Sequence, residues 1–448
     1  MRTLRQHLFV FGFYLLLACV ITWPVITSLS GGFMGGGTSD AYEMARHIWW
    51  FKHAFQNGLD PFWQSNLGYP HGINGVSLYA NTLQFFPAWL FAFVMPLATA
   101  YNLTILLTMA LNGWALWFLV RYLLQSLANT ATVGTPFWVS AGRAEARPYD
   151  KHTQDQVNLA SLLAGVVFMA YPTFQGHLFD GHAGLMVMWP VPLYVYALLR
   201  LIAAKPGRDM LTWLALSVLL FWLSPSGHML QAIYVLLPLL GLFWLALIWR
   251  RDWRGAWRVF MSGALGGIVL LIFLIPVLLD TFNSEAYTGT QGYVRYSVDL
   301  LGIVSPSFMH PLYGSLDYTG RVLGVNLGEG SAYVGILAAL LCVIAVIKFR
   351  AERWWLLLAF VAWIFALGPL LKLFDQPLQV SIEDAQTYIT LPFAFLVDIP
   401  GFNLARTPGR FTFTLALAVA VMAGYGAAWL FSKVRRGRVG VFAVLTVL

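Results

Sequence analysis

Residues 31–75, GGFMGGGTSDAYEMARHIWWFKHAFQNGLDPFWQSNLGYPHGING, form a polar, glycine-rich stretch between apolar segments that are long enough to cross a membrane. Between Asp40 and Phe55 the apolar residues recur at helical spacing, opposite a charged face. This pattern predicts an amphipathic helix that lies on the bilayer surface. The aromatic side chains that we expect at the depth of the lipid headgroups are Trp49, Trp50 and Trp63.

Two carboxylates stand at the head of this helix, Asp40 directly after the glycine run and Glu43 three residues later. A carboxylate there can accept a proton from an attacking hydroxyl, or ligate a divalent cation that neutralises phosphate. The alternative is a helix N-cap formed by Thr38, Ser39 or Asp40, with Glu43 completing a capping box. The two roles are compatible, because a cap also fixes the carboxylate. We predict that Asp40 and Glu43 are catalytic and face the outside of the membrane.

The composition indicates a multi-pass membrane protein. Of the 448 residues, 59% are hydrophobic and only 10% are charged, whereas a soluble domain carries about 25% charged residues. The net charge of +8 is typical of anchoring at the inner membrane face, and we expect no nucleic-acid partner. Cys19 and Cys342 lie inside apolar runs, so we expect no disulfide. The fold class is therefore an all-α, polytopic single transmembrane domain.

We expect about 11–12 transmembrane helices, since a span needs about 20 mainly apolar residues and shorter ones survive inside a bundle. The expected spans are 8–27, 101–123, 158–172, 185–203, 210–224, 228–249, 258–279, 332–349, 353–373, 409–432 and 438 onward. Residues 78–97 are a further apolar segment, but they contain two prolines and the polar Asn81 and Gln84.

The basic residues decide how 78–97 is placed. If this segment re-enters or lies at the interface, most Lys and Arg, including those of 124–157, fall on the cytoplasmic side. If it crosses, every later loop changes side, and most basic loops then fall outside, against the tendency of Lys and Arg to lie on the cytoplasmic side. The sequence therefore predicts a plasma-membrane protein with a cytoplasmic N-terminus and a cytoplasmic 124–157 loop. The predicted outer loops include 29–80, 280–331 and 374–408.

Histidines gather on the predicted outer side. His177, Asp180 and His182 crowd one turn between two spans. Imidazoles and a carboxylate at that density can bind a metal or hold a phosphate, and our metal candidates are Asp40, Asp180 and His182. The alternative is an interfacial loop whose histidines only cap helix ends. His228 opens another helix on the same side and can join this group or cap its own helix.

Three more charged residues lie at the outer ends of predicted spans. Glu329 precedes a span, where an ionisable residue is a functional candidate, or a partner of the helix dipole. Arg406 and Arg410 stand four residues apart at a helix start, where positive charge opposes the dipole. Together with free backbone N–H groups, they make a good phosphate site. The alternative is that they bind lipid headgroups.

The order of these pieces resembles the membrane glycosyltransferases of the C type (the GT-C fold), and within them the bacterial YfhO-like branch. The residues that carry the resemblance are Gly36-Gly-Thr-Ser-Asp40, Tyr69-Pro-His-Gly72, Ala100-Tyr-Asn-Leu103, Gly181-His182 before Trp189-Pro190, Gly328-Glu329 with Tyr333, and Arg406-Thr-Pro-Gly-Arg410. The resemblance covers nearly the whole chain as architecture, although each motif is short.

The resemblance implies an inverting hexosyl- or pentosyltransferase. It would take a sugar from a polyprenyl-phosphate donor, a membrane lipid, and transfer it to a lipid, glycan or protein hydroxyl at the outer face. Asp40 would be the base, and Arg406 and Arg410 would hold the lipid phosphate. Other residues that would contact substrate are His71, His177, His182, Glu329 and Tyr333, and a divalent cation such as Mg²⁺ or Mn²⁺ would assist. The alternative function is a flippase or transporter of a lipid-linked or anionic substrate.

Overall fold

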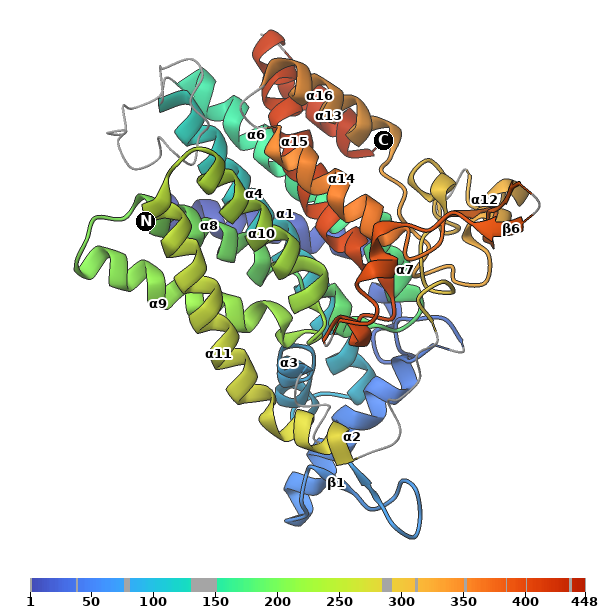
Figure 1. The fold of residues 1–448 in the computed structure, drawn as a ribbon. Coiled ribbons are helices and arrows are strands. Elements are labelled where there is room, and N and C mark those ends of the chain that lie inside the picture. The colour runs from blue at the N-terminus through green and yellow to red at the C-terminus, as the bar shows by residue number, and fades with distance from the viewer. Residues whose placement is uncertain are drawn as a thin grey trace.

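The structure is a computed structural model that describes residues 2–37, 39–75, 81–129, 151–283, 292–310, 313–349, 353–383, 385–399, 401–434 and 437–447. Helices make up most of it, and the long ones form a bundle with shorter helices and loops at its ends (Figure 1). The longer helices are α1 (Arg2–Ile21), α4 (Leu97–Asn129), α6 (Lys151–Met169), α8 (Pro190–Ala203), α9 (Arg208–Leu223), α10 (Leu237–Trp249), α11 (Trp253–Asn283) and α15 (Thr412–Lys433).

Shorter elements connect the bundle helices. The short α-helices are α2 (Ala41–Asn57), α3 (Thr82–Ala92), α7 (Pro172–Phe179), α12 (Asp317–Leu323), α13 (Ile336–Lys348), α14 (Trp354–Ala366) and α16 (Arg438–Val447). Three small antiparallel hairpins pair β1 (Trp63–Gln64) with β2 (Ile73–Asn74), β3 (Lys372–Leu373) with β4 (Gln376–Pro377), and β5 (Gln379–Ile382) with β6 (Ala385–Tyr388). Single helical turns include η3 (Ala183–Met186), the π-helical η5 (Ala232–Leu236) and η11 (Pro408–Phe411).

Within the described residues, eight helical segments are long and apolar enough to cross a membrane. The count of about 11–12 predicted from the sequence also includes α13 and α14, which are apolar but have 13 residues each, and the segment from residue 438 onward. α3 has 11 residues and an internal Pro87, too few to cross a bilayer alone. The sidedness of the loops remains a prediction from charge, and most of the 124–157 loop lies outside the described residues.

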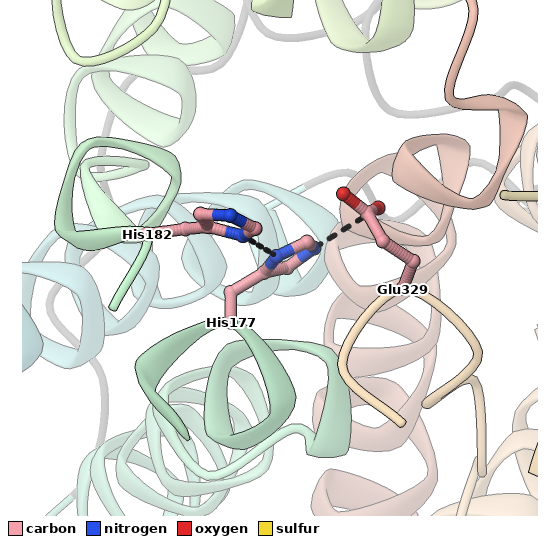
Figure 2. Close-up of side chains that lie close together, drawn as sticks. All are labelled: His177, His182 and Glu329. Atoms are coloured by element: carbon pink, nitrogen blue, oxygen red, sulfur yellow. Dashed lines mark hydrogen bonds and ion pairs between the residues drawn. The ribbon is translucent and has the colours of Figure 1, made fainter. Parts of the chain in front are cut away.

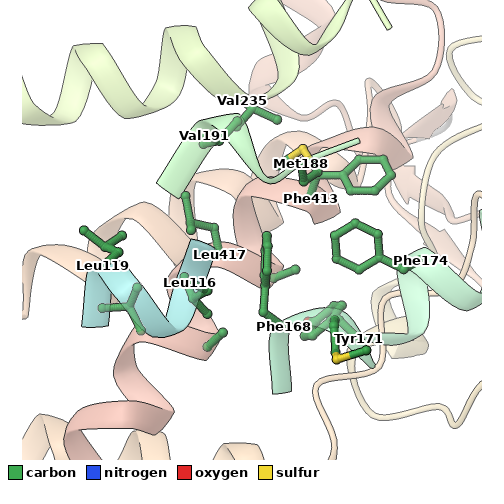
Figure 3. Close-up of a cluster of buried hydrophobic side chains, with 14 of the residues drawn as sticks. Leu116, Leu119, Phe168, Tyr171, Phe174, Met188, Val191, Val235, Phe413 and Leu417 are labelled. Atoms are coloured by element: carbon green, nitrogen blue, oxygen red, sulfur yellow. The ribbon is translucent and has the colours of Figure 1, made fainter. Parts of the chain in front are cut away.

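Helix α15 is the centre of the bundle. It is buried continuously from Thr412 to Ala427 and packs against α6, α13 and α14. Small residues make this possible because they let helix backbones approach closely. A Cβ added at Gly424, for instance, would lie 3.1 Å from Cβ of Ala164 on α6. At one end of α15, Phe413 meets Phe174 of α7 and Met188 within a buried apolar cluster (Figure 3).

The helix expected at the bilayer surface is α2. Its buried residues include Ala41, Ala45 and Ile48, as the periodicity predicts. Trp50, however, faces the protein: it is buried, and its Nε1 donates a hydrogen bond to the carbonyl of Pro61 at 3.2 Å. The loop that follows α2 therefore folds back over Trp50, and the depth of this side chain in the bilayer stays a prediction. Trp49 and Trp63 are exposed.

Candidate functional site

Three segments that are far apart in sequence meet where α2 begins. They are residues 36–41, the turn that follows α7, and residues 328–329 before α13. The Gly36 N–H donates to the carbonyl of Phe179 at 2.6 Å, and the Asp40 N–H donates to the carbonyl of Asp180 at 3.0 Å. These two backbone hydrogen bonds fix the start of α2 against the end of α7.

Glycines allow the three segments to approach so closely. Gly181 has a φ of +78°, which side-chain-bearing residues rarely adopt, and a Cβ there would clash with the backbone of Asp40 and Ala41. At Gly176 a Cβ would lie 2.7 Å from the carbonyl oxygen of Gly328. The backbone contacts therefore place Asp40, the α7 turn and Glu329 next to one another.

A line of ionisable side chains begins at Asp40. His182 Nε2 lies 3.2 Å from Oδ2 of Asp40, and the two histidines approach each other with 3.1 Å between their Nδ1 atoms. His177 Nε2 then lies 3.6 Å from Oε2 of Glu329 (Figure 2). The line thus runs from one carboxylate through two imidazoles to a second carboxylate.

The line ends in a buried ion pair. Arg410 donates to Oε1 of Glu329 from both Nε, at 2.9 Å, and Nη2, at 2.7 Å. Its Nη1 lies 3.2 Å from Nε2 of His228. Arg410 is held in place because Thr407, three residues before it, contacts the Tyr234 hydroxyl of η5 at 2.7 Å. The guanidinium is therefore already engaged by protein groups.

Burial differs sharply along this line. The side chain of Asp40 is 54% exposed and that of His182 is 24% exposed, whereas His177 is 1% and Glu329 is 6% exposed. The ring of His177 stacks on Phe413, with 5.1 Å between centroids. The Asp40 end is therefore open to a substrate, and the Glu329 end is built into the protein.

The pKa shifts follow from these contacts. The hydrogen bond with His182 lowers the pKa of Asp40. Burial acts to raise the pKa of Glu329, but the charge and hydrogen bond of Arg410, together with the charges of His177 and His182, outweigh it, and the net pKa is lowered. Burial raises the pKa of Asp180 and lowers that of His228 well below its usual value. The site therefore favours ionised carboxylates at both ends of the line and a neutral His228.

The structure separates the two predicted catalytic carboxylates. The side chain of Asp40 makes no capping hydrogen bond to α2 and turns to His182 instead; the Ala41 N–H reaches only Ser39 Oγ, at 3.4 Å. Glu43 Oε1 lies 3.4 Å from Nε2 of the buried His47. The capping alternative is therefore not observed for Asp40, and Glu43 belongs to a second group of polar residues.

This second group was not recognised from the sequence. Arg46 and Gln64 contact each other through their side chains, and the Gln64 amide lies 3.2 Å from Nδ1 of His47. The hydrogen bond with His47 lowers the pKa of Glu43, and burial lowers the pKa of His47. The i, i+4 spacing of Glu43 and His47 was a signal that could have revealed the pair.

Arg406 and Arg410, the two arginines predicted to bind phosphate, also have different surroundings. Arg410 is bound to Glu329 and His228, so it is not free to hold a lipid phosphate. Arg406 is exposed, and within the described residues its positive charge acts on the hydroxyl of Tyr293. Of the pair predicted to bind phosphate, Arg406 alone is accessible.

Two further predicted residues do not join the line. His71 is exposed in the turn between β1 and β2, and this hairpin contacts α2 through Gln64, which meets Arg46 and His47. Tyr333 is partly buried, and no hydrogen bond joins it to the line among the described residues. The resemblance implies that His71 and Tyr333 contact the substrate. The structure shows no contact of either residue with Asp40 among the described residues.

A family model described as a domain of unknown function (DUF6311) matches residues 10–448. The chain belongs to this family. Because the match covers nearly the whole chain, every residue of the site lies within the family domain. A search of curated proteins found no match.

Within the described residues of this DUF6311 chain, the groups that could hold a metal are His177, His182 and Glu329, which each offer one ligand atom within 4.8 Å of the others. This set differs from the predicted one of Asp40, Asp180 and His182, because Asp40 lies on the far side of His182. Two imidazoles and one carboxylate fit a transition-metal ion, whereas Mg²⁺ prefers oxygen ligands in octahedral geometry. The residues therefore fit a divalent cation, but of a different class from Mg²⁺.

Proposed function

We propose that the chain transfers a sugar from a polyprenyl-phosphate donor to an acceptor hydroxyl at the outer face of the plasma membrane, as a glycosyltransferase of the GT-C type. The observation that carries this proposal is the accessible Asp40 carboxylate, held by His182 at the head of α2. A general base must be ionised and within reach of the hydroxyl that it activates. Asp40 meets the first condition through its lowered pKa and the second through its exposure.

The reaction assigns a role to each accessible group. The acceptor O–H gives its proton to Asp40, its oxygen attacks the anomeric carbon, and the bond from that carbon to the phosphate oxygen breaks. His182 orients the carboxylate, which becomes neutral when it takes up the proton. The lipid phosphate leaves as an anion, and in this proposal the exposed Arg406 binds it. Arg410 keeps Glu329 in place.

The test uses purified full-length protein and a polyprenyl-phosphate donor with a labelled sugar. We expect transfer to an acceptor and release of polyprenyl phosphate by the wild type. Arg406→Lys keeps the charge but loses the bidentate fork, so the KM for donor should rise while the melting temperature stays unchanged. Arg321→Lys is the matched control, because Arg321 is an exposed arginine that pairs with Asp317.

The alternative function, a flippase or transporter, predicts a different result in the same preparation. Reconstituted vesicles would then move the labelled donor across the bilayer without releasing polyprenyl phosphate. Movement without transfer, tested with lipid, glycan and peptide acceptors, would contradict the glycosyltransferase proposal.

A further inference from the structure

The line from Asp40 to Glu329 has fewer hydrogens than it needs. Three contacts, Asp40–His182, His182–His177 and His177–Glu329, each require one hydrogen between the two facing atoms. A neutral imidazole carries a single N–H, so two rings supply two hydrogens. Both carboxylates act as acceptors in their other contacts, because Arg410 donates twice to Glu329 and a nitrogen of His182 faces Asp40. With two neutral imidazoles, one of the three contacts therefore lacks a hydrogen.

The geometry shows where the hydrogen is missing. His177 Nε2 and Glu329 Oε2 are 3.6 Å apart, beyond the range of about 2.7–3.2 Å for a hydrogen bond. Both atoms are buried, and neither has a hydrogen-bond partner in the described structure. Stacking on Phe413 keeps the His177 ring in this orientation. The two buried atoms thus face each other across a gap, along the dashed line in Figure 2.

The two oxygens of Glu329 have different surroundings. Oε1 accepts both hydrogen bonds from Arg410, whereas Oε2 faces Nε2 of His177. A cation in the gap would satisfy Oε2 and His177 Nε2 together.

We propose that His177, His182 and Glu329 bind one divalent transition-metal ion of the Zn²⁺ type. The gap of 3.6 Å between His177 Nε2 and Glu329 Oε2 is close to the spacing of about 3.3 Å between two ligands of a tetrahedral zinc ion with bonds of 2.0–2.1 Å. A nitrogen of His182 lies within 4.8 Å of the other ligand atoms. Two imidazoles favour Zn²⁺ over Mg²⁺.

The surroundings of the three ligands fit a metal centre. Asp40 holds the Nε2–H of His182, as carboxylates commonly do for metal-bound histidines. Nδ1 of His182 faces Nδ1 of His177 at 3.1 Å and would exchange that contact for the ion. Arg410 orients Glu329 through Oε1 and leaves Oε2 for the ion. Because Asp40 and His182 are partly exposed, the ion can reach its three ligands from the protein surface on this side.

Metal binding can be measured without substrate, and so separately from the proposed transfer reaction. Full-length protein, with any affinity tag removed, is treated with a chelator, dialysed and titrated with Zn²⁺ or Mg²⁺. We expect one Zn²⁺ per chain by elemental analysis, a higher melting temperature with Zn²⁺, and no such rise with Mg²⁺. Co²⁺ should bind at the same site and give the visible absorption of a tetrahedral ion.

Two variants locate the ion. His182→Gln and Glu329→Gln should each weaken Zn²⁺ binding by at least about tenfold. Because Glu329→Gln also disturbs a buried ion pair, the partly exposed His182 gives a second test that does not depend on that pair. His53→Gln is the control, since His53 lies outside the site and contacts Trp49 and Asn57. Failure of the wild type to retain Zn²⁺, or wild-type affinity in His182→Gln, would overturn the proposal.

Discussion

Arg410→Met tests whether Arg410 serves the structure, as its contacts indicate, or the substrate. The guanidinium donates twice to Oε1 of Glu329 and lies beside His228. Its side chain is 12% exposed and that of Glu329 is 6% exposed. Methionine keeps an unbranched, flexible side chain but removes the charge and all donors. Glu329 would then remain buried with no cation beside it.

The magnitude follows from this burial. Removing one partner of a buried ion pair costs about 3–5 kcal/mol of the free energy of unfolding, because the other charge stays buried and unpaired. The upper part of this range applies here, since Oε2 of Glu329 already lacks a hydrogen-bond partner in the described structure. Removing both charges in Arg410→Met/Glu329→Leu should recover most of the loss, because no isolated charge is left.

The assay follows unfolding of the metal-free protein in detergent through the fluorescence of its 19 tryptophans. All variants are heated at one scan rate, and Arg321→Met is the control for loss of an exposed arginine. We expect a clear fall in the unfolding temperature of Arg410→Met and a partial return in the double variant. An Arg410→Met protein that unfolds at the wild-type temperature would refute the structural role and restore Arg410 as a candidate phosphate ligand.

Three other predictions concern the neighbourhood and the topology. Gly181→Ala should destabilise the protein more than Gly58→Ala, because both positions have positive φ but only a Cβ at Gly181 would clash with the start of α2; equal unfolding temperatures would remove the clash argument. Burial lowers the pKa of His47 below 6.5 in the folded protein. As pH decreases from 7 to 5, the unfolded chain therefore binds a proton at His47 before the folded protein does, and the free energy of unfolding should fall. His47→Gln should lose less over that range, and identical slopes would contradict this. A membrane-impermeant thiol reagent should label Asn57→Cys but not Glu145→Cys from outside, whereas labelling of both would reverse the predicted topology.

Periodicity and composition predicted the helices well, because lipid requires long apolar segments whatever their tertiary contacts. They predicted the buried face of α2 through Ala41, Ala45 and Ile48. They did not predict that Trp50 is covered, since the sequence does not say that the following loop returns to it. They also did not predict that α13 and α14 are only 13 residues long, because the turns beside these helices are apolar as well.

The sequence identified individual site residues better than their partners. Asp40, His177, His182, Glu329 and Arg410 were each singled out as charged or titratable groups at helix ends. Their pairing depends on backbone contacts at Gly176 and Gly181, which bring together segments separated by more than a hundred residues. Such contacts leave no periodic pattern. For this reason Glu43 was joined to Asp40 and Arg410 to Arg406, whereas the structure pairs them with His47 and Glu329.

The most direct test of the central claim is the rate of sugar transfer by Asp40→Asn. The amide keeps the size of the side chain but cannot act as a base, so we expect the rate to fall by about 10²–10⁴-fold. The unfolding temperature should change little, because Asp40 is 54% exposed and makes no capping bond. Asp60→Asn, an exposed aspartate in the same loop, is the control and should retain the wild-type rate. A wild-type rate in Asp40→Asn would contradict the claim that this carboxylate performs the chemistry.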